Sequence, residues 1–461
     1  MRLAYLVLYT SVLAALAATP AIAADAQPWT LQSAIGNPQN FSVSGSFRAR
    51  IEALDGQFRP GLDDGDNLIL LRTTLAAEYH ESSFRIGAEL FDSRAYFDDH
   101  NSSVSTSEVN TFELVQGYVG GSFGEVLGAG SETSVTAGRF TLDLGSRRLV
   151  ARNDFRNTTN AFTGIHFDWR GSAKEQLTLF YTLPQLRLPS GREAVLGNAI
   201  EFDHEGSELR FWGGFFSAPK LVPGTTVELY FYGLNENASE GRPTRNRHLY
   251  TPGTRLYHSS DPGEFDYELE GAYQFGDART GTANNAAKQD VSAYFVHVQV
   301  GRTFKIVWSP RIAVGYDRDS GDHSKSASIN RFDTLFGARR FDFGPTSIYG
   351  PLARTNLSSP EARLEVKPDA RWDGLVAYRA AWLDSSTDSF SNTGVRDVSG
   401  RSGTFAGHQI ETRVRYWLVP KRIRLDSGGA VFFNARFLDE APNRAGNGNT
   451  LYGYFSVTTS F

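Results

Sequence analysis

A dense run of arginines is the part of this sequence best able to carry chemistry. Between residues 139 and 156 the chain holds five arginines and only two aspartates. A guanidinium is always charged and binds carboxylate, phosphate or sulfate through a planar fork of donors. At a constriction of a water-filled path, such a group would attract anions. Two other interpretations stay open: outer loops that bridge lipopolysaccharide phosphates, and plain solvated charge. Only seven of the 46 basic residues are Lys, but a GC-rich genome would also favour arginine codons.

Charged side chains also recur on single faces of segments that alternate like strands. These faces comprise Arg48, Arg50 and Glu52; Arg72 and Glu78; Arg85 and Glu89; Arg413 and Arg415 with Gln409 and Glu411; and Asp266, Glu268 and Glu270. Facing rows of opposite charge are typical of the transverse field in a water-filled pore. The alternative is that these groups pair with one another and simply fill the interior.

The sequence contains little that would support catalysis. Its nine histidines lack the spacing of metal ligands, and no cysteine is present. Neither a nucleophile elbow nor a phosphate-binding loop occurs. We therefore expect no enzyme activity, no cofactor and no metal. The basic residues also form no patch large enough for nucleic-acid binding.

The elements that must position these residues are strands. Residues 41–53 place Phe47 and Ile51 on one face and Arg48 and Arg50 on the other. The C-terminal segment 451–461 shows the same period and ends in Phe461, as the closing strand of an outer-membrane barrel commonly does. The predicted strands are 41–53, 67–79, 83–97, 109–123, 132–142, 160–170, 174–183, 207–217, 224–234, 245–257, 264–276, 289–303, 308–318, 357–367, 371–384, 406–418, 424–438 and 450–461. This pattern predicts an all-β fold, a transmembrane antiparallel β-barrel of about 18 strands in an up-and-down meander.

The connections between these segments alternate between long and short. Long loops on one side and tight turns on the other are typical of outer-membrane barrels. The longest connection, 319–356, contains Phe332, Phe336, Phe341 and Phe343, and we expect it to pack on or into the barrel mouth.

The N-terminus has the features of a secretory signal. A short basic start, an apolar stretch and a small-residue cleavage site predict a signal peptide over 1–23 for Sec export. A membrane anchor is the weaker interpretation because the apolar stretch is short. We assign 24–40 to a periplasmic lead-in and 41–461 to the barrel.

Three blocks of the sequence resemble the alginate export family of outer-membrane barrels. They read GRFTLDLGSRRLV at 138–150, FDYELEGAYQFG at 265–276 and GHQIETRVRY at 407–416. The resemblance implies a monomeric eighteen-stranded barrel with an arginine-lined selectivity zone for an acidic polysaccharide. On this chain it implies that Arg139, Arg147, Arg148 and Arg152 line the path. The turn 419–423 departs from the family by being too short to hold a long periplasmic plug.

These observations predict passive passage of an anionic, alginate-like polysaccharide or oligosaccharide across a Gram-negative outer membrane. The alternatives are an uptake porin for small organic acids or sugars, and a structural or adhesin barrel with a blocked lumen. Expected partners are membrane lipid and lipopolysaccharide, the saccharide, and a periplasmic export or processing complex. The residues expected along the path are Arg139, Arg147, Arg148, Arg152, Arg48, Arg50, Arg72, Arg85, Arg413, Arg415 and Glu268.

Overall fold

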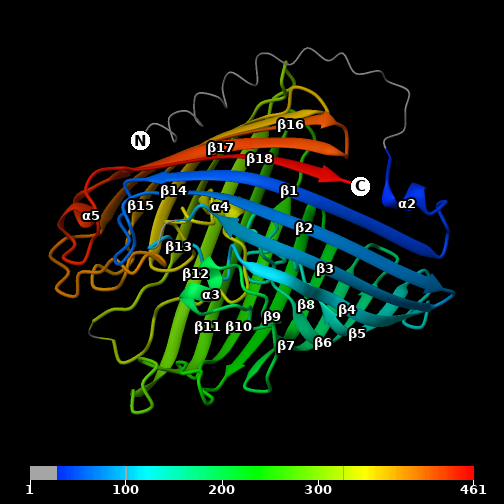
Figure 1. Ribbon diagram of the computed structural model, residues 1–461, viewed down its shortest axis with the longest axis horizontal. Helices are drawn as coiled ribbons and strands as arrows, with labels where there is room; N and C mark the ends of the chain where they lie inside the picture. Colours follow the sequence, from blue (N-terminus) through cyan, green and yellow to red (C-terminus); the bar gives the residue numbers. More distant parts are fainter. Residues whose placement is uncertain (1–28, 99–100, 325) are drawn as a thin grey trace.

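A single antiparallel sheet of eighteen strands closes on itself to form a barrel (Figure 1). The computed structural model describes residues 29–98, 101–324 and 326–461. Each strand pairs with the next along the chain, and β1 also pairs with β18, from Ser46 opposite Ser460 to Asp55 opposite Leu451. The predicted fold class is therefore confirmed. The predicted signal peptide 1–23 lies outside the described residues, and the described part of the lead-in contains the short helix α2 (Leu31–Ala34).

The strands follow the predicted segments closely. They are β1 (Phe41–Asp55), β2 (Asp66–Glu81), β3 (Phe84–Tyr96), β4 (Asn110–Gly124), β5 (Glu132–Phe140), β6 (Phe162–Arg170), β7 (Gln176–Pro184), β8 (Leu209–Val222), β9 (Thr225–Glu236), β10 (His248–His258), β11 (Phe265–Arg279), β12 (Lys288–Thr303), β13 (Arg311–Asp319), β14 (Leu357–Val366), β15 (Trp372–Trp382), β16 (Phe405–Val419), β17 (Ile423–Asn434) and β18 (Thr450–Ser460). The prediction for 424–438 was wrong at its end, because β17 stops at Asn434 and α5 (Arg436–Glu440) follows. This helix buries Phe437 and Leu438, so their burial comes from a helical turn rather than from alternation along a strand.

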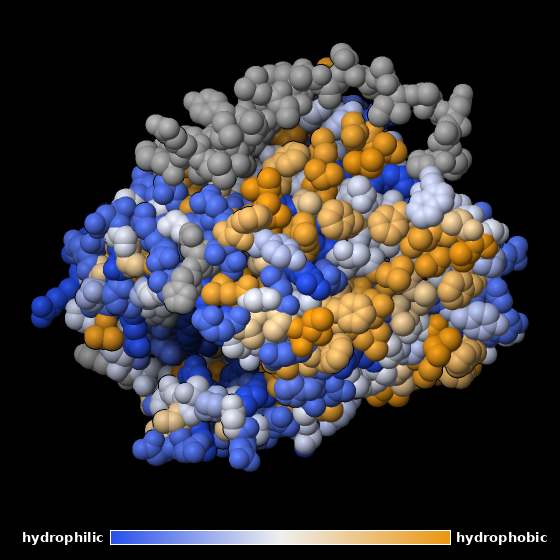
Figure 2. Space-filling model, viewed as in Figure 1, coloured by the Kyte–Doolittle hydropathy of each residue, from blue (hydrophilic) through white to orange (hydrophobic). Residues whose placement is uncertain are grey.

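Side chains alternate between the outside and the interior of the barrel. In β1, Phe47 and Ile51 are exposed on the outside, whereas Arg48 and Arg50 are buried in the lumen. Figure 2 shows hydrophobic side chains spread over the strands and hydrophilic ones gathered near α5. An apolar outer wall with a polar interior is the arrangement that a lipid bilayer requires of a barrel. Among the described residues, no helix is long and apolar enough to cross a membrane.

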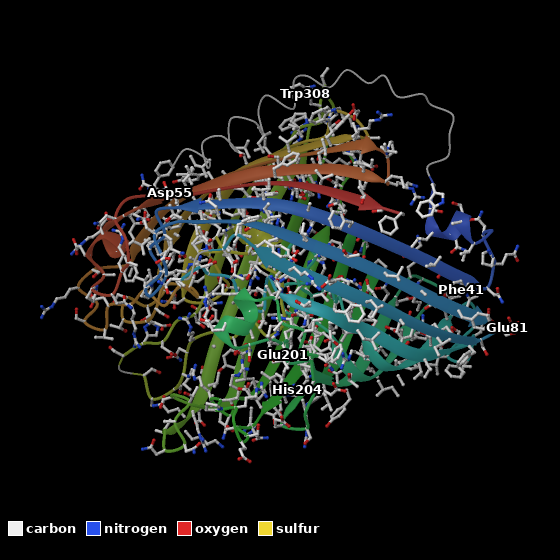
Figure 3. The ribbon with its side chains drawn as sticks, viewed as in Figure 1. Phe41, Asp55, Glu81, Glu201, His204 and Trp308 are labelled. Atoms are coloured by element: carbon white, nitrogen blue, oxygen red, sulfur yellow. The ribbon has the colours of Figure 1, made fainter. Side chains whose placement is uncertain are left out.

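The two ends of the barrel differ in their connections. Phe41 and Glu81 lie at the end with short turns, and Asp55 lies at the end with long loops (Figure 3). The turn between β2 and β3 is only Ser82 and Ser83, whereas 141–161, 185–208 and 320–356 are long loops. The predicted alternation of long and short connections is therefore confirmed.

Two of the long loops fold into the lumen instead of standing above it. We call 141–161 and 320–356 the inserted loops. The second contains α4 (Arg340–Phe343) and buries Phe332 and Phe343, as predicted for the longest loop. Phe332 joins a core cluster with residues of β8 to β12, and Phe343 joins a cluster with residues of β16 to β18. The inserted loops therefore supply the interior packing that the barrel wall alone would lack.

Candidate functional site

The inserted loops meet inside the barrel and form a partition across part of the lumen. Val150 pairs with Phe336 as a parallel bridge, and the amide of Phe336 donates to the carbonyl of Leu149 at 3.0 Å. Gly337 allows the two loops to approach each other this closely, because a Cβ at this position would overlap the carbonyl of Arg148. The bridge and this glycine fix the two loops to each other.

Buried ion pairs fix the partition to the wall. Arg148 binds Asp342 through two hydrogen bonds, of 2.9 and 3.0 Å, and its other donors reach Glu268 and Glu270 on β11. Arg354 also binds Asp342, at 2.6 Å. Burial opposes ionisation of Asp342, but Arg148 and Arg354 outweigh it and hold its pKa well below the usual value. Arg148 therefore acts as a structural tie between loop and wall.

Lumen-facing arginines of β1 and β2 hold the other end of the first inserted loop. Arg48 donates to the carbonyls of Asp154, at 2.9 Å, and of Arg156, at 3.0 Å. Arg72 donates to the Asp154 carbonyl at 3.1 Å. Within the described chain, neither Arg48 nor Arg72 has a carboxylate at salt-bridge distance. Arg50 pairs with Glu52 at 2.7 Å and donates to a loop carbonyl. These strand residues thus position the segment that carries Arg156.

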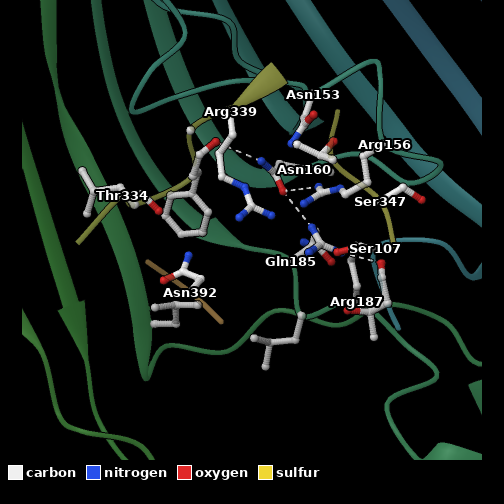
Figure 4. A pocket seen from close by; sticks show the side chains of 18 of the residues that line it. Ser107, Asn153, Arg156, Asn160, Gln185, Arg187, Thr334, Arg339, Ser347 and Asn392 are labelled. Atoms are coloured by element: carbon white, nitrogen blue, oxygen red, sulfur yellow. Dashed lines mark hydrogen bonds between the residues drawn. The ribbon is translucent and has the colours of Figure 1, made fainter. Parts of the chain in front are cut away.

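A cavity of about 410 Å³ opens on the long-loop side of the partition (Figure 4). We call it the outer cavity. Its arginines are Arg156, Arg187, Arg242, Arg247 and Arg339, and among the described residues no carboxylate lines it. Arg242 and Arg247 have a partner in Glu236, which lies outside the lining. The other three form no salt bridge with any described residue.

The three arginines without salt bridges are held by neutral oxygen atoms. The side-chain oxygen of Asn160 accepts from Arg156 at 2.7 Å and from Arg187 at 2.7 Å, so two guanidinium groups converge on one amide (Figure 4). Arg339 reaches only the carbonyls of Gly350 and Leu352, at 3.4 Å each. Such partners orient the donors without cancelling their charge.

Two buried acids, Glu108 and Asp203, provide counter-charge for this group. Glu108 accepts from the backbone and hydroxyl of Ser105, and burial raises its pKa to about 7. Removal from bulk water lowers the pKa of Arg156, and the neighbouring charges of Arg187 and Arg339 lower it further. Burial also lowers the pKa of Arg187, opposed by Asp203 and then by Glu108, and the pKa of Arg339, opposed by Glu108. The outer cavity therefore has an excess of positive charge that an anion would relieve.

The residues predicted from the sequence are distributed along the lumen rather than gathered at one point. Arg139 pairs with Glu113 at 2.6 Å and Glu205 at 3.2 Å, and Arg152 pairs with Glu89 at 2.5 Å. Of the other predicted residues, Arg85 donates a hydrogen bond to Thr136, and Arg413 and Arg415 form ion pairs with Asp373. Glu268 also pairs with Arg255, and Arg147 lies over the ring of Phe341. Most of these positive charges are neutralised by acids.

Sequence reasoning missed the roles of Arg187 and Arg339. Both lie in loops far from the 139–156 cluster, and only folding brings them beside Arg156. The one available signal was the Arg339-Arg340 pair inside a loop already expected to enter the barrel mouth.

Comparison with known proteins agrees with this architecture. The family model described as alginate export matches residues 39–451. No curated protein matches the sequence. Among solved structures, Pseudomonas aeruginosa OpdK with vanillate has 11% identity and a TM-score of 0.56, covering 91% of this chain and 98% of its own. Pseudomonas aeruginosa OccK2 (OpdF) with glucuronate has 12% identity and the same TM-score of 0.56, covering 92% and 99%. Acinetobacter baumannii OccAB1 also has 12% identity and a TM-score of 0.56, covering 91% and 97%. At these identities the solved structures show a shared fold.

Proposed function

We propose that this chain, which belongs to the alginate export family, passes a carboxylated saccharide through its lumen by passive diffusion. Members of this family are channels of the Gram-negative outer membrane rather than enzymes. The observation that carries this proposal is the outer cavity, where Arg156, Arg187 and Arg339 have no acidic partner at salt-bridge distance among the residues that the structure describes. A permanently charged group near a low-dielectric wall attracts an anion more strongly than it would in water.

The contacts of the cavity suit a solute that must enter and leave. A carboxylate could replace the Asn160 oxygen between Arg156 and Arg187, where each bond is 2.7 Å long. When the solute departs, the amide would take the donors back, so neither state leaves them unsatisfied. Sites that bind weakly and in series favour conduction over trapping.

The remaining lining of the cavity suits a sugar. Ser107, Asn153, Gln185 and Asn392 line the same space as the arginines (Figure 4). Hydroxyl and amide groups can exchange hydrogen bonds with sugar hydroxyls. An alginate-like chain carries both a carboxylate and hydroxyls on each residue, so it could use both kinds of contact at every step.

Uptake of small acids is the second candidate function, favoured by the volume of about 410 Å³, which falls within the range typical of small-molecule sites. The two Pseudomonas aeruginosa barrels named above were solved with vanillate and with glucuronate, and both molecules are carboxylates. Export of a polymer would also require a periplasmic complex that delivers the chain, whereas uptake would not.

Planar-bilayer conductance tests the proposal. We expect the wild-type channel to prefer anions and to be blocked by uronate oligomers more than by neutral oligosaccharides of equal length. The double variant Arg156→Gln, Arg187→Gln should weaken uronate block about tenfold or more, because a hydrogen bond to a charged group is worth roughly 1.5–3 kcal/mol.

A matched control is Arg436→Gln, which removes an exposed arginine paired with Glu440 at 3.1 Å outside the lumen. It should leave selectivity and block unchanged. A wild-type channel that prefers cations, or a double variant that is blocked as strongly as the wild type, would refute the proposed function.

A further inference from the structure

One arginine of the partition remains without a polar partner for its side chain. The guanidinium of Arg147 lies 3.9 Å from the ring centroid of Phe341, so the two inserted loops each contribute one member of this pair. Within the described part of the chain, the Arg147 side chain makes no hydrogen bond and has no carboxylate at salt-bridge distance. Phe341 is 40% exposed, although Arg340, Asp342 and Phe343 beside it are buried.

The pair lies toward the short-turn end of the lumen, which faces the periplasm in outer-membrane barrels. Arg148, the next residue along the chain, reaches Glu268 near the short-turn end of β11. The carbonyl of Phe341 accepts a hydrogen bond of 2.9 Å from Arg363, near the short-turn end of β14. The outer cavity, by contrast, includes residues of the long loops that follow β3, β7, β9 and β15, namely Ser107, Arg187, Arg242 and Asn392. The two places therefore lie toward opposite ends of the lumen.

An acid that interacts with this arginine already accepts a backbone hydrogen bond. Asp143 interacts electrostatically with Arg147 but accepts the backbone amide of Arg152 at 2.8 Å. Arg363, which lies beside Phe341, has its own partner in Glu361 at 2.6 Å. Among the described residues at this level of the lumen, Arg147 therefore keeps its side-chain donors available, unlike Arg148 and Arg363.

A guanidinium stacked on an aromatic ring has a restricted orientation and keeps the donors on its edge free. The exposed part of the ring offers an apolar surface next to those donors. A ligand that suits both features has a carboxylate attached directly to a ring with an apolar face, as in a hexuronate pyranose.

We propose that Arg147 and Phe341 form a second binding site, on the periplasmic side of the partition, for a carboxylate borne on a ring. This inference rests on the proposed function, since it names a class of anion for the same path. Together with the outer cavity it gives the channel one site on each side of the partition.

The test compares glucuronate with gluconate, which share six carbons and one carboxylate but differ in ring closure. Each is added from the periplasmic side of a single channel, and its concentration for half-block is measured. We expect wild type to bind glucuronate about three- to fivefold more tightly than gluconate, because the apolar face of its ring buries roughly one CH2 equivalent of surface against Phe341. Phe341→Leu should abolish that preference while leaving the potassium-to-chloride permeability ratio unchanged.

Arg147→Gln should weaken block by both acids about tenfold from the periplasmic side and leave block from the extracellular side unchanged. Arg147→Lys should restore only part of the block, because it keeps the charge without the fork. The matched control is Phe265→Leu, since Phe265 also stacks with an arginine, Arg302 at 5.1 Å, but is 61% exposed on the outer face of the barrel.

The outcomes separate this inference from the proposed function. Equal binding of the two acids by wild type, or a ring preference that survives in Phe341→Leu, overturns the second site even when anion selectivity and uronate block at the outer cavity persist. Loss of selectivity in wild type overturns the proposed function. A ring preference that depends on Phe341 and on Arg147, but not on Phe265, supports the second site.

Discussion

Replacing Asp342 by Asn should release the partition from the wall. Asp342 accepts three side-chain hydrogen bonds, two from Arg148 at 2.9 and 3.0 Å and one from Arg354 at 2.6 Å. Arg148 would keep Glu270, but the nearest remaining acids of Arg354, Asp317 and Asp319, are 3.8 Å away. Removing one partner of a buried ion pair destabilises by about 3–5 kcal/mol because the other charge stays buried. A shift of that size changes the ratio of closed to released partition by about two to four orders of magnitude.

Single-channel recording and limited trypsin digestion would reveal this release. We expect Asp342→Asn to show larger and more frequent conductance steps than the wild type, and cleavage after Arg339 and Arg340. The control is Asp439→Asn, which takes the 57% exposed carboxylate of Asp439 from its 3.0 Å pair with Arg444 and should cost less than about 1 kcal/mol. If Asp342→Asn and Asp439→Asn give identical conductance and identical protection from trypsin, the ion pairs of Asp342 do not hold the partition.

Two further perturbations act on the same region. Gly337→Ala should separate the inserted loops and add conductance noise, because the new Cβ would overlap the Arg148 carbonyl. The control Gly281→Ala should add no noise, because the nearest atom to its Cβ is 3.9 Å away. Equal noise in the two variants would contradict the close approach of the loops at Gly337. Uronate block should weaken as the pH rises through about 7, because Glu108, whose pKa is about 7, gains the negative charge that neutralises the arginines around it. In the Glu108→Gln variant, uronate block should stay strong both below and above pH 7. A smaller change should remain near pH 6, where Asp203 beside Arg187 titrates. A Glu108→Gln channel with the full wild-type pH dependence would exclude this residue as the titrating group.

The barrel could be predicted from the sequence because lipid and water impose a period of two on every strand. In β1 the pattern separates Phe47 from Arg48 along the whole segment, and the predicted span 41–53 differs from the observed Phe41–Asp55 only at its end. The error after Asn434 arose where this constraint stops. Phe437 is buried by the helix α5 at the barrel mouth, where no bilayer enforces alternation.

The site could be predicted only in part, since the state of each arginine depends on contacts that are distant in sequence. Arg139 looked available, yet Glu113 neutralises it at 2.6 Å from the neighbouring strand β4. Arg187 gave no local signal, and it becomes important because Asn160 holds it beside Arg156. Residue type predicted the chemistry of the lumen, but the pairing of each charge depends on how the two loops enter it.

The arginines of the lumen differ in whether acids accompany them, and under the proposed function this difference separates structural from transport roles. Arg148 has acids from both α4 and β11, and such pairs secure a partition whose charges would otherwise be costly to bury. In the described part of the chain, the side chains of Arg156 and Arg187 donate only to neutral oxygens, although the fold supplies acids freely elsewhere. A fold selected for stability alone would pair these charges as well, because unpaired positive charges repel one another and lose hydration. Arginines without a salt bridge beside a cavity therefore support the proposed function, in which a carboxylated solute would supply a mobile counter-charge each time it passes.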